Sequence, residues 1–75
     1  MKDLVAYIAG ALVNDKNALT ITEDLDGKQR VITIKAENGE IGKLIGKQGN
    51  IANSIRTIMK AASDPSERVI LNITD

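Results

Sequence analysis

The sequence predicts a small α+β domain with two layers, in which three helices cover one face of a three-stranded mixed sheet. Apolar residues recur at helical spacing in three segments and alternate with polar residues in three others. Their order along the chain is helix, strand, strand, helix, helix, strand. The 75 residues, of which 43% are hydrophobic, suffice for one domain with a core, which we expect to span residues 1–75.

The first predicted helix runs from about Asp3 to Val13. Leu4, Ile8 and Leu12 recur at the spacing of one helical face, and Asp3 is a residue type favoured at the N-cap. The apolar run is well short of the roughly 20 residues that a membrane span requires. Asp3 also interrupts the basic start that a signal peptide would have. We therefore expect a cytoplasmic protein that does not associate with membranes.

Two strands joined by a tight turn are expected next. Residues 19–22 alternate apolar and polar side chains, Asp26-Gly27 is typical of a hairpin turn, and residues 31–36 read as the second strand. The hairpin makes these strands antiparallel neighbours. Alternation places Ile32, Ile34 and Ala36 on the inner face and leaves polar residues on the other, namely Thr20, Thr33, Lys35 and Asn72.

Two helices and a last strand complete the chain. Ile41 and Leu44 mark a short helix, and a longer amphipathic helix begins at Asn50. Pro65 ends that helix, because proline cannot continue it and disfavours helical geometry in the residue before it. Residues 69–73 alternate as a strand. After a two-helix crossover, this strand is expected to run parallel to one of the first two.

The composition excludes several classes of function. The chain has no cysteine and no histidine, which removes thiol chemistry, disulfides, zinc ligation and imidazole base catalysis. Its single aromatic residue, Tyr7, argues against a surface that stacks successive bases on rings. Asp24 and Asp26 have no base or nucleophile accompanying them. We therefore predict no enzyme activity, no metal and no cofactor.

Positive charge is concentrated in one segment. Residues 41–63 contain four basic and no acidic side chains, whereas the other 52 residues hold 6 basic and 10 acidic ones. A basic segment in a protein of zero net charge is typical of a focused anion site, but also of a solvated helix face. Charge alone leaves both interpretations open. The four cations are Lys43, Lys47, Arg56 and Lys60.

The segment Ile-Gly-Lys-Gln-Gly-Asn-Ile at residues 45–51 joins the two helices within this basic region. Gly46 follows the last apolar residue of the short helix, where a left-handed residue is favoured. Gly49 precedes the long helix, whose first N–H groups favour an anion. Between them, Lys47 supplies charge and Gln48 a hydrogen-bond donor. The glycines alone are also explained as helix caps, but their place in the basic segment favours a clamp on a phosphate backbone.

The strand–helix–GKQG–helix–strand core resembles a KH domain, whose G-x-x-G loop clamps about four nucleotides of single strand. A helix and two strands precede this core, which is the type II arrangement. More narrowly, the chain resembles the small bacterial KhpA family through residues 4–8, 11–14, 41–49, 51–52 and 55–57. The resemblance implies a cytoplasmic RNA-binding protein, an RNA chaperone or post-transcriptional regulator linked to cell elongation and cell wall homeostasis. It also implies self-association and pairing with a larger KhpB-like KH protein.

These inferences assign roles to the residues of the candidate site. The two glycines allow close approach of the nucleic acid backbone, the amides of Gly49 and Asn50 bind phosphate, and Lys47 supplies charge. Lys43 and Arg56 widen the positive field. Two isoleucines form an apolar floor under the bases. The predicted RNA-binding residues are Lys43, Ile45, Gly46, Lys47, Gln48, Gly49, Asn50, Ile51 and Arg56.

A second hypothesis is that the chain is a protein-interaction module with a degenerate KH domain. Asp24 and Asp26, in a hairpin loop expected to border the groove, repel phosphate. Ile58 and Met59 on the long helix are the predicted dimer surface, because the apolar stripe of that helix is wider than the sheet can cover. Ile70 on the outer sheet face is a further candidate for contact with a partner.

Overall fold

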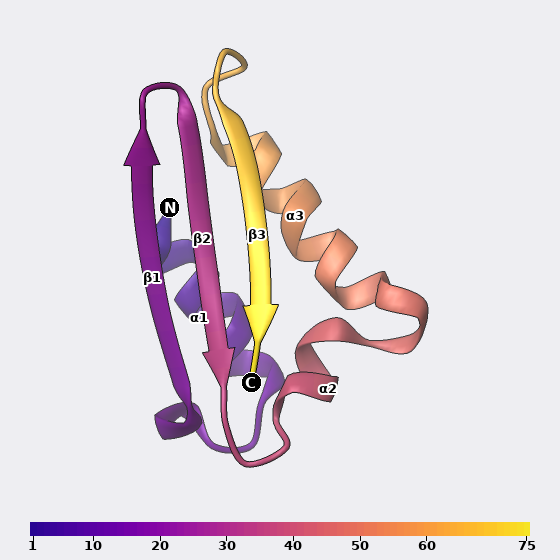
Figure 1. Ribbon diagram of the computed structural model, residues 1–75. Helices are drawn as coiled ribbons and strands as arrows, with labels where there is room; N and C mark the ends of the chain where they lie inside the picture. Colours follow the sequence, from indigo (N-terminus) through magenta and orange to yellow (C-terminus); the bar gives the residue numbers. More distant parts are fainter.

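The computed structural model describes residues 1–75 and consists of a sheet with three helices packed on one of its faces (Figure 1). Short 3₁₀ turns at residues 16–18 and 47–49 precede the first strand and the last helix. The predicted α+β class and element order are confirmed. The helices are α1 (Lys2–Leu12), α2 (Ile41–Ile45) and α3 (Asn50–Ala62), and the strands are β1 (Leu19–Asp26), β2 (Gln29–Ala36) and β3 (Arg68–Thr74).

The strand order in the sheet is β1-β2-β3. β1 and β2 are antiparallel, with Glu23 opposite Ile32, while β2 and β3 are parallel, with Ile32 opposite Leu71. The crossover from β2 to β3 passes through α2 and α3, which is why the third strand returns parallel, as predicted. The central position of β2 leaves β1 and β3 as the two edges of the sheet.

The core lies between the helices and the inner face of the sheet. Ile32, Ile34 and Ala36 of β2 are completely buried, as the alternation predicted. Removing a side chain such as leucine or isoleucine from water contributes about 1.5–3 kcal/mol, so this layer contributes much of the stability of a small domain. On the outer face Thr20, Lys35 and Asn72 are exposed and Thr33 is half-buried. The largest fully buried side chains come from both layers: Ile32, Ile34, Leu44, Ile55, Met59 and Val5.

The hairpin is longer than predicted. β1 continues through Asp26, which pairs with Gln29, so the turn consists of Gly27 and Lys28 and not of Asp26-Gly27. Gly27 has a φ of +62°, as a tight two-residue hairpin turn requires at its first position. Pairing with the long strand β2 satisfies the backbone groups of Asp24 and Asp26 and overrides the low strand propensity of aspartate.

Helix α1 begins one residue earlier than predicted. Met1 occupies the N-cap position without a side-chain hydrogen bond, so the prediction of Asp3 as the N-cap is wrong. Asp3 lies in the first turn, where its carboxylate interacts favourably with the positive end of the helix. None of the helices has the length and apolar character needed to cross a membrane.

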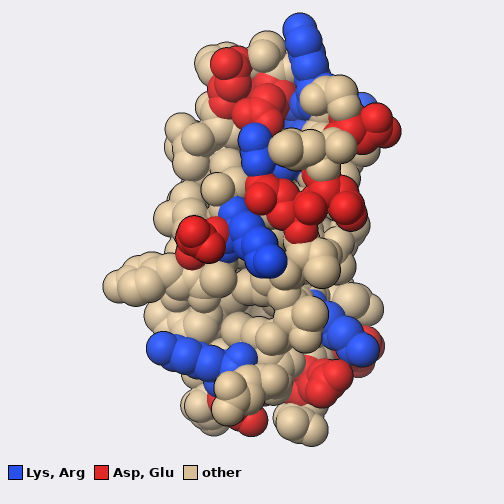
Figure 2. All heavy atoms as spheres, turned by 90° about the vertical axis from the view of Figure 1, so that its left-hand side faces the viewer, with Lys and Arg blue, Asp and Glu red and all other residues tan.

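The free edge of β1 carries acidic side chains. The hydrogen bond from the Glu37 amide to the Ala18 carbonyl, 2.9 Å long, begins the β1–β2 ladder. Because antiparallel pairs alternate, Ile21, Glu23 and Leu25 then point their backbone groups away from β2. Figure 2 shows this side of the molecule, with most acidic side chains gathered towards its upper part, where basic ones lie among them. Charged residues on an edge strand disfavour pairing with another chain.

Candidate nucleic-acid interface

The loop formed by Gly46, Lys47, Gln48 and Gly49, here called the GKQG loop, joins α2 to α3 and has an unusual backbone. Gly46 has φ and ψ of +73° and 178°, a region that is essentially restricted to glycine. Gln48 and Gly49 follow with φ of +57° and +77°. The positive φ expected at Gly46 is confirmed, although ψ is extended and not left-handed helical.

Gly46 is also required by packing. A Cβ atom on Gly46 would lie 2.6 Å from Cγ1 and 2.9 Å from Cβ of Ile51. Ile51 therefore covers Gly46 directly, and it packs on its other side against the core. Ile45, immediately before the loop, is 38% exposed. At Gly49 the nearest atom, Nδ2 of Asn53, is 4.0 Å from the corresponding Cβ position, so only the backbone conformation requires glycine there.

The first amides of α3 are engaged within the loop. The Gly49 N–H donates to the Gly46 carbonyl at 3.3 Å, and the Asn50 N–H donates to the Lys47 carbonyl. The expectation that these two amides are free to bind phosphate is therefore wrong. The reason is that the loop closes on itself through two hydrogen bonds between residues three apart, with Gln48 in the left-handed region, and these bonds use the N–H groups that the start of a helix otherwise leaves without partners. The exposed polar groups at its tip are the side chains of Lys47 and Gln48.

The cations near the loop differ in their pairing. Lys43 Nζ lies 2.6 Å from Oε1 of Glu40, so its charge is locally neutralised. Lys47 makes no ion pair, and Arg56 donates from Nη1 to Oδ1 of the neutral Asn53 at 2.6 Å. Of the three cations among the predicted site residues, Lys47 and Arg56 therefore provide the uncompensated positive charge.

Glu40 fixes the start of α2 and hence the base of the loop. Its side chain is buried, accepts a hydrogen bond of 2.7 Å from the Asp15 amide at Oε2, and holds Lys43 with the other oxygen. The pairing with Lys43, and then the Asp15 N–H, keep the pKa of the Glu40 carboxyl below its usual range. Glu40 thus ties the connection between α1 and β1 to α2.

A groove of about 730 Å³ lies between α3 and the edge strand β3, on the side where Figure 1 shows these two elements next to each other. Arg56 lines it and is six residues after the start of α3, or about 9 Å along the helix. One helix thus carries both the GKQG loop and a groove wall. The groove is lined by Arg56, Lys60, Ser63, Asp64, Pro65, Glu67, Arg68, Val69, Ile70 and Leu71.

The charges in the groove were only partly foreseen. Lys60 and Arg68 line it and make no ion pair, yet neither was among the predicted site residues. The basic segment contained the signal for Lys60, whereas the position of Arg68 depends on the parallel pairing of β3. Asp24 and Asp26 do not border the groove, contrary to expectation, because they lie on β1 at the opposite edge of the sheet.

The structure separates the two residues predicted for a dimer surface. Met59 is completely buried in the core, so the prediction that it contacts a partner is wrong. Ile58 is 42% exposed and borders a shallow hollow with Asn50, Asn53, Ser54 and Thr57. Ile70 is half-buried on the outer face of the sheet, opposite Val31. Tyr7, 78% exposed on α1, does not line the groove.

The chemistry of this region is that of anion binding. Lys47 at the loop and Arg56, Lys60 and Arg68 along the groove offer unpaired positive charge, whereas the space beside Gly46 is filled by Ile51. No three histidine, cysteine, aspartate or glutamate side chains come together as a metal site.

Comparisons with known proteins point to one family. The family model described as "KhpA/KhpB, KH domain" matches residues 2–73. A protein of Caldanaerobacter subterraneus subsp. tengcongensis named RNA-binding protein KhpA is 42% identical over 97% of this chain and 99% of its own length. Proteins of the same name from Aquifex aeolicus and Halalkalibacterium halodurans are 40% and 38% identical over all of this chain, and over 96% and 100% of their own lengths. No solved structure matches the chain.

Proposed function

The chain belongs to the KhpA/KhpB family of KH-domain proteins, and on that premise we propose that it binds single-stranded RNA through the GKQG loop and the groove between α3 and β3. The observation that carries this proposal is the exposed Lys47–Gln48 tip of the loop that leads directly into α3, the helix that carries the groove cation Arg56. Protein side chains cannot reach the base edges in the deep major groove of an A-form duplex, whereas the bases of a single strand are accessible. We therefore propose a single strand as the ligand of the loop and the groove.

Each predicted residue has a place in this proposal. Gly46 and Gly49 shape the loop so that phosphates approach its backbone, and Lys47 and Gln48 contact them. Asn50 begins α3 beside the loop. Lys43 binds a phosphate only if that phosphate replaces Glu40 as the partner of its ammonium group. Ile45 and Ile51 offer apolar contact to the first bases, and Arg56 attracts the strand into the groove, where Lys60 and Arg68 continue the line of cations.

The wider biological role is part of the same proposal. The relatives are named for RNA binding, and they match this chain over nearly its full length. We propose that this protein acts in the cytoplasm as an RNA chaperone or post-transcriptional regulator connected with cell elongation and cell wall homeostasis. A larger KhpB-like protein is its proposed mixed partner.

Affinity for a short single strand is expected to be weak. Non-specific binding of nucleic acid lies at about 10⁻⁴–10⁻⁶ M, and a groove with a few cations and no aromatic ring should not exceed it by much. Fluorescence anisotropy with a labelled six-nucleotide RNA measures this, with the same strand in a duplex as the control. No saturation by about 1 mM, or preference for the duplex, contradicts the proposal. A nanomolar constant shows instead a recognition surface beyond this groove.

We also propose that the working unit is a dimer formed through the exposed face of α3 at Ile58. A small domain gains stability from a partner, and two weak clamps held together raise affinity through effective concentration by about 10²–10⁴-fold when the geometry permits. Analytical ultracentrifugation across concentration should show a species of twice the 8.1 kDa mass. Ile58→Asp should return it to the monomer.

Tyr7→Asp is the matched control for this dimer, since it places the same charge on an exposed apolar residue of a different helix. It should leave the mass unchanged. A wild-type protein that remains at 8.1 kDa into the hundreds of micromolar leaves only the mixed pair with a larger protein. If Ile58→Asp abolishes both the dimer and RNA binding, the result favours an RNA site that needs both copies over a pure protein-interaction module.

A further inference from the structure

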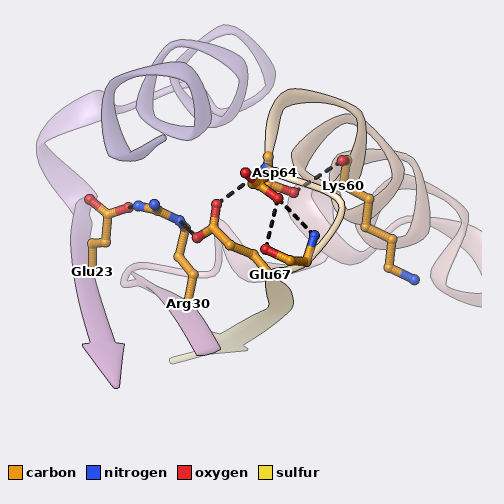
Figure 3. Close-up of polar contacts among 7 residues, drawn as sticks. Glu23, Arg30, Lys60, Asp64 and Glu67 are labelled. Carbon is orange, nitrogen blue, oxygen red and sulfur yellow. Dashed lines mark hydrogen bonds and ion pairs between the residues drawn. The ribbon is translucent and has the colours of Figure 1, made fainter. Parts of the chain in front are cut away.

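Arg30 connects three segments that are distant in the sequence. From β2 it donates from Nε to Oε2 of Glu67 at 2.9 Å and from Nη1 to Oε2 of Glu23 on β1. All three side chains are about one-fifth exposed. Figure 3 shows the guanidinium lying between the two carboxylates, one on each side. The hydrogen bonds to Glu23 and then to Glu67 raise the pKa of Arg30, so the cation is retained throughout the ordinary pH range.

Glu67 uses both of its carboxylate oxygens. While Oε2 accepts from Arg30, Oε1 accepts from the Asp64 amide at 3.2 Å, as the dashed lines in Figure 3 show. Asp64 in turn accepts at Oδ1 from the amide and from the hydroxyl of Ser66, each at 2.8 Å. These two bonds lower the pKa of the Asp64 carboxyl. The connection from α3 to β3 is therefore closed by bonds that lead back to Arg30.

Both of these carboxylates line the groove, together with the unpaired cations Arg56, Lys60 and Arg68. A carboxylate in a nucleic acid groove repels phosphate unless its charge is compensated. Arg30 compensates Glu67 from β2 and is not itself a lining residue of the groove. The positive potential of the groove thus depends on a residue outside it.

We propose that Arg30 is a positioning residue for nucleic acid binding, which holds the Glu67 carboxylate against the sheet and so removes its negative charge from the path of the strand. This inference rests on the proposed function and adds a determinant of affinity outside the loop and the groove. Without Arg30, only the hydrogen bond of 3.2 Å from the Asp64 amide still holds Glu67, and its carboxylate can turn towards the groove cations Lys60 and Arg68 and compete there with phosphate.

A double-mutant cycle of Arg30→Gln and Glu67→Gln tests this inference, with dissociation constants measured for a labelled six-nucleotide RNA. Arg30→Gln should weaken binding about fivefold at low salt, the order expected for one additional negative charge within a Debye length of phosphate. In the Glu67→Gln background the same change should alter binding by less than about twofold. The fivefold loss should also shrink at high salt, because the repulsion is then screened.

The matched control is Glu23→Gln, which removes the other partner of Arg30 from a strand remote from the groove and should leave the affinity unchanged. A merely structural role of Arg30 predicts equal losses in both Glu67 backgrounds, independent of salt, and that result overturns the inference, as does the absence of any loss. Urea unfolding confirms that each variant is folded. If Arg30→Gln does not fold, Arg30→Lys is compared in the same two backgrounds. An ammonium group cannot bridge Glu23 and Glu67 from two nitrogen atoms as the guanidinium does.

The proposed function and this inference fail in different ways. If wild-type protein and a variant with an acidic loop bind RNA equally, the proposed function is wrong. If binding depends on the loop but not on the pairing of Arg30 with Glu67, only the role of Arg30 is wrong.

Discussion

Replacing Lys47 and Gln48 with aspartate is expected to abolish binding of single-stranded RNA while leaving the domain folded. The change puts two carboxylates at the exposed tip of the GKQG loop, where phosphates are proposed to pass. We expect a loss of more than tenfold in affinity, and a decrease in the salt slope by about 0.7 for each lost phosphate contact. Both are measured by anisotropy titrations at several salt concentrations.

The fold should tolerate this double change. Neither side chain is buried, and aspartate is among the residues that best accept the positive φ of Gln48. Lys28→Asp is the matched control for Lys47→Asp, since it makes the same charge change in the hairpin turn, which Figure 1 shows at the other end of the sheet. Unchanged RNA affinity in a folded double variant would exclude the clamp and favour the interaction module.

Replacing Gly46 with alanine is expected to be the most destabilising single change in the loop. Its backbone lies in a region that costs other residues about 1–3 kcal/mol, and its new Cβ would overlap Ile51 in a packed contact, at a further cost of about 1–3 kcal/mol. The total approaches the stability of about 4–11 kcal/mol expected for a domain of this size. Urea unfolding followed by circular dichroism measures the loss.

Gly49→Ala separates the cost of the backbone conformation from the cost of the overlap with Ile51. Gly49 has a similar φ but open space around its Cβ position, so we expect a loss of only about 1–2 kcal/mol. Adding Ile51→Ala to Gly46→Ala should cost less than the sum of the single changes, because the overlap is removed. Equal destabilisation by Gly46→Ala and Gly49→Ala would show that Ile51 moves away from the new Cβ atom without a loss of free energy of unfolding.

The sequence was sufficient to predict the layers, the element order and the loop. The reason is that the informative signals are local: alternation in β2, helical spacing in α3, and two glycines around Lys47. The ends of the elements were less well predicted. Asp3 was misplaced as a cap and β1 was made too short, because strand pairing and helix starts depend on partners that local propensity does not contain.

The parts of the site that involve distant residues could not be predicted. Lys43 was expected to be a free cation, but Glu40 neutralises it, and Glu40 is held by the backbone of a segment 25 residues away. Met59 is buried and its neighbour Ile58 is exposed because of the way α3 is rotated about its own axis against the sheet. Arg68 enters the groove through the parallel register of β3. None of these contacts leaves a pattern in a single sequence.

The parallel pairing of β2 with β3 also affects the order in which the domain is completed during synthesis. The β1–β2 hairpin requires only neighbouring residues and forms early, whereas β3 pairs across the whole two-helix crossover. β3 is also the last element of the domain to leave the ribosome, and it provides one wall of the groove. A nascent chain that lacks it has the GKQG loop but no groove, and the backbone groups of β2 that pair with β3 are left without partners. The proposed RNA-binding groove is thus completed together with the final closure of the core.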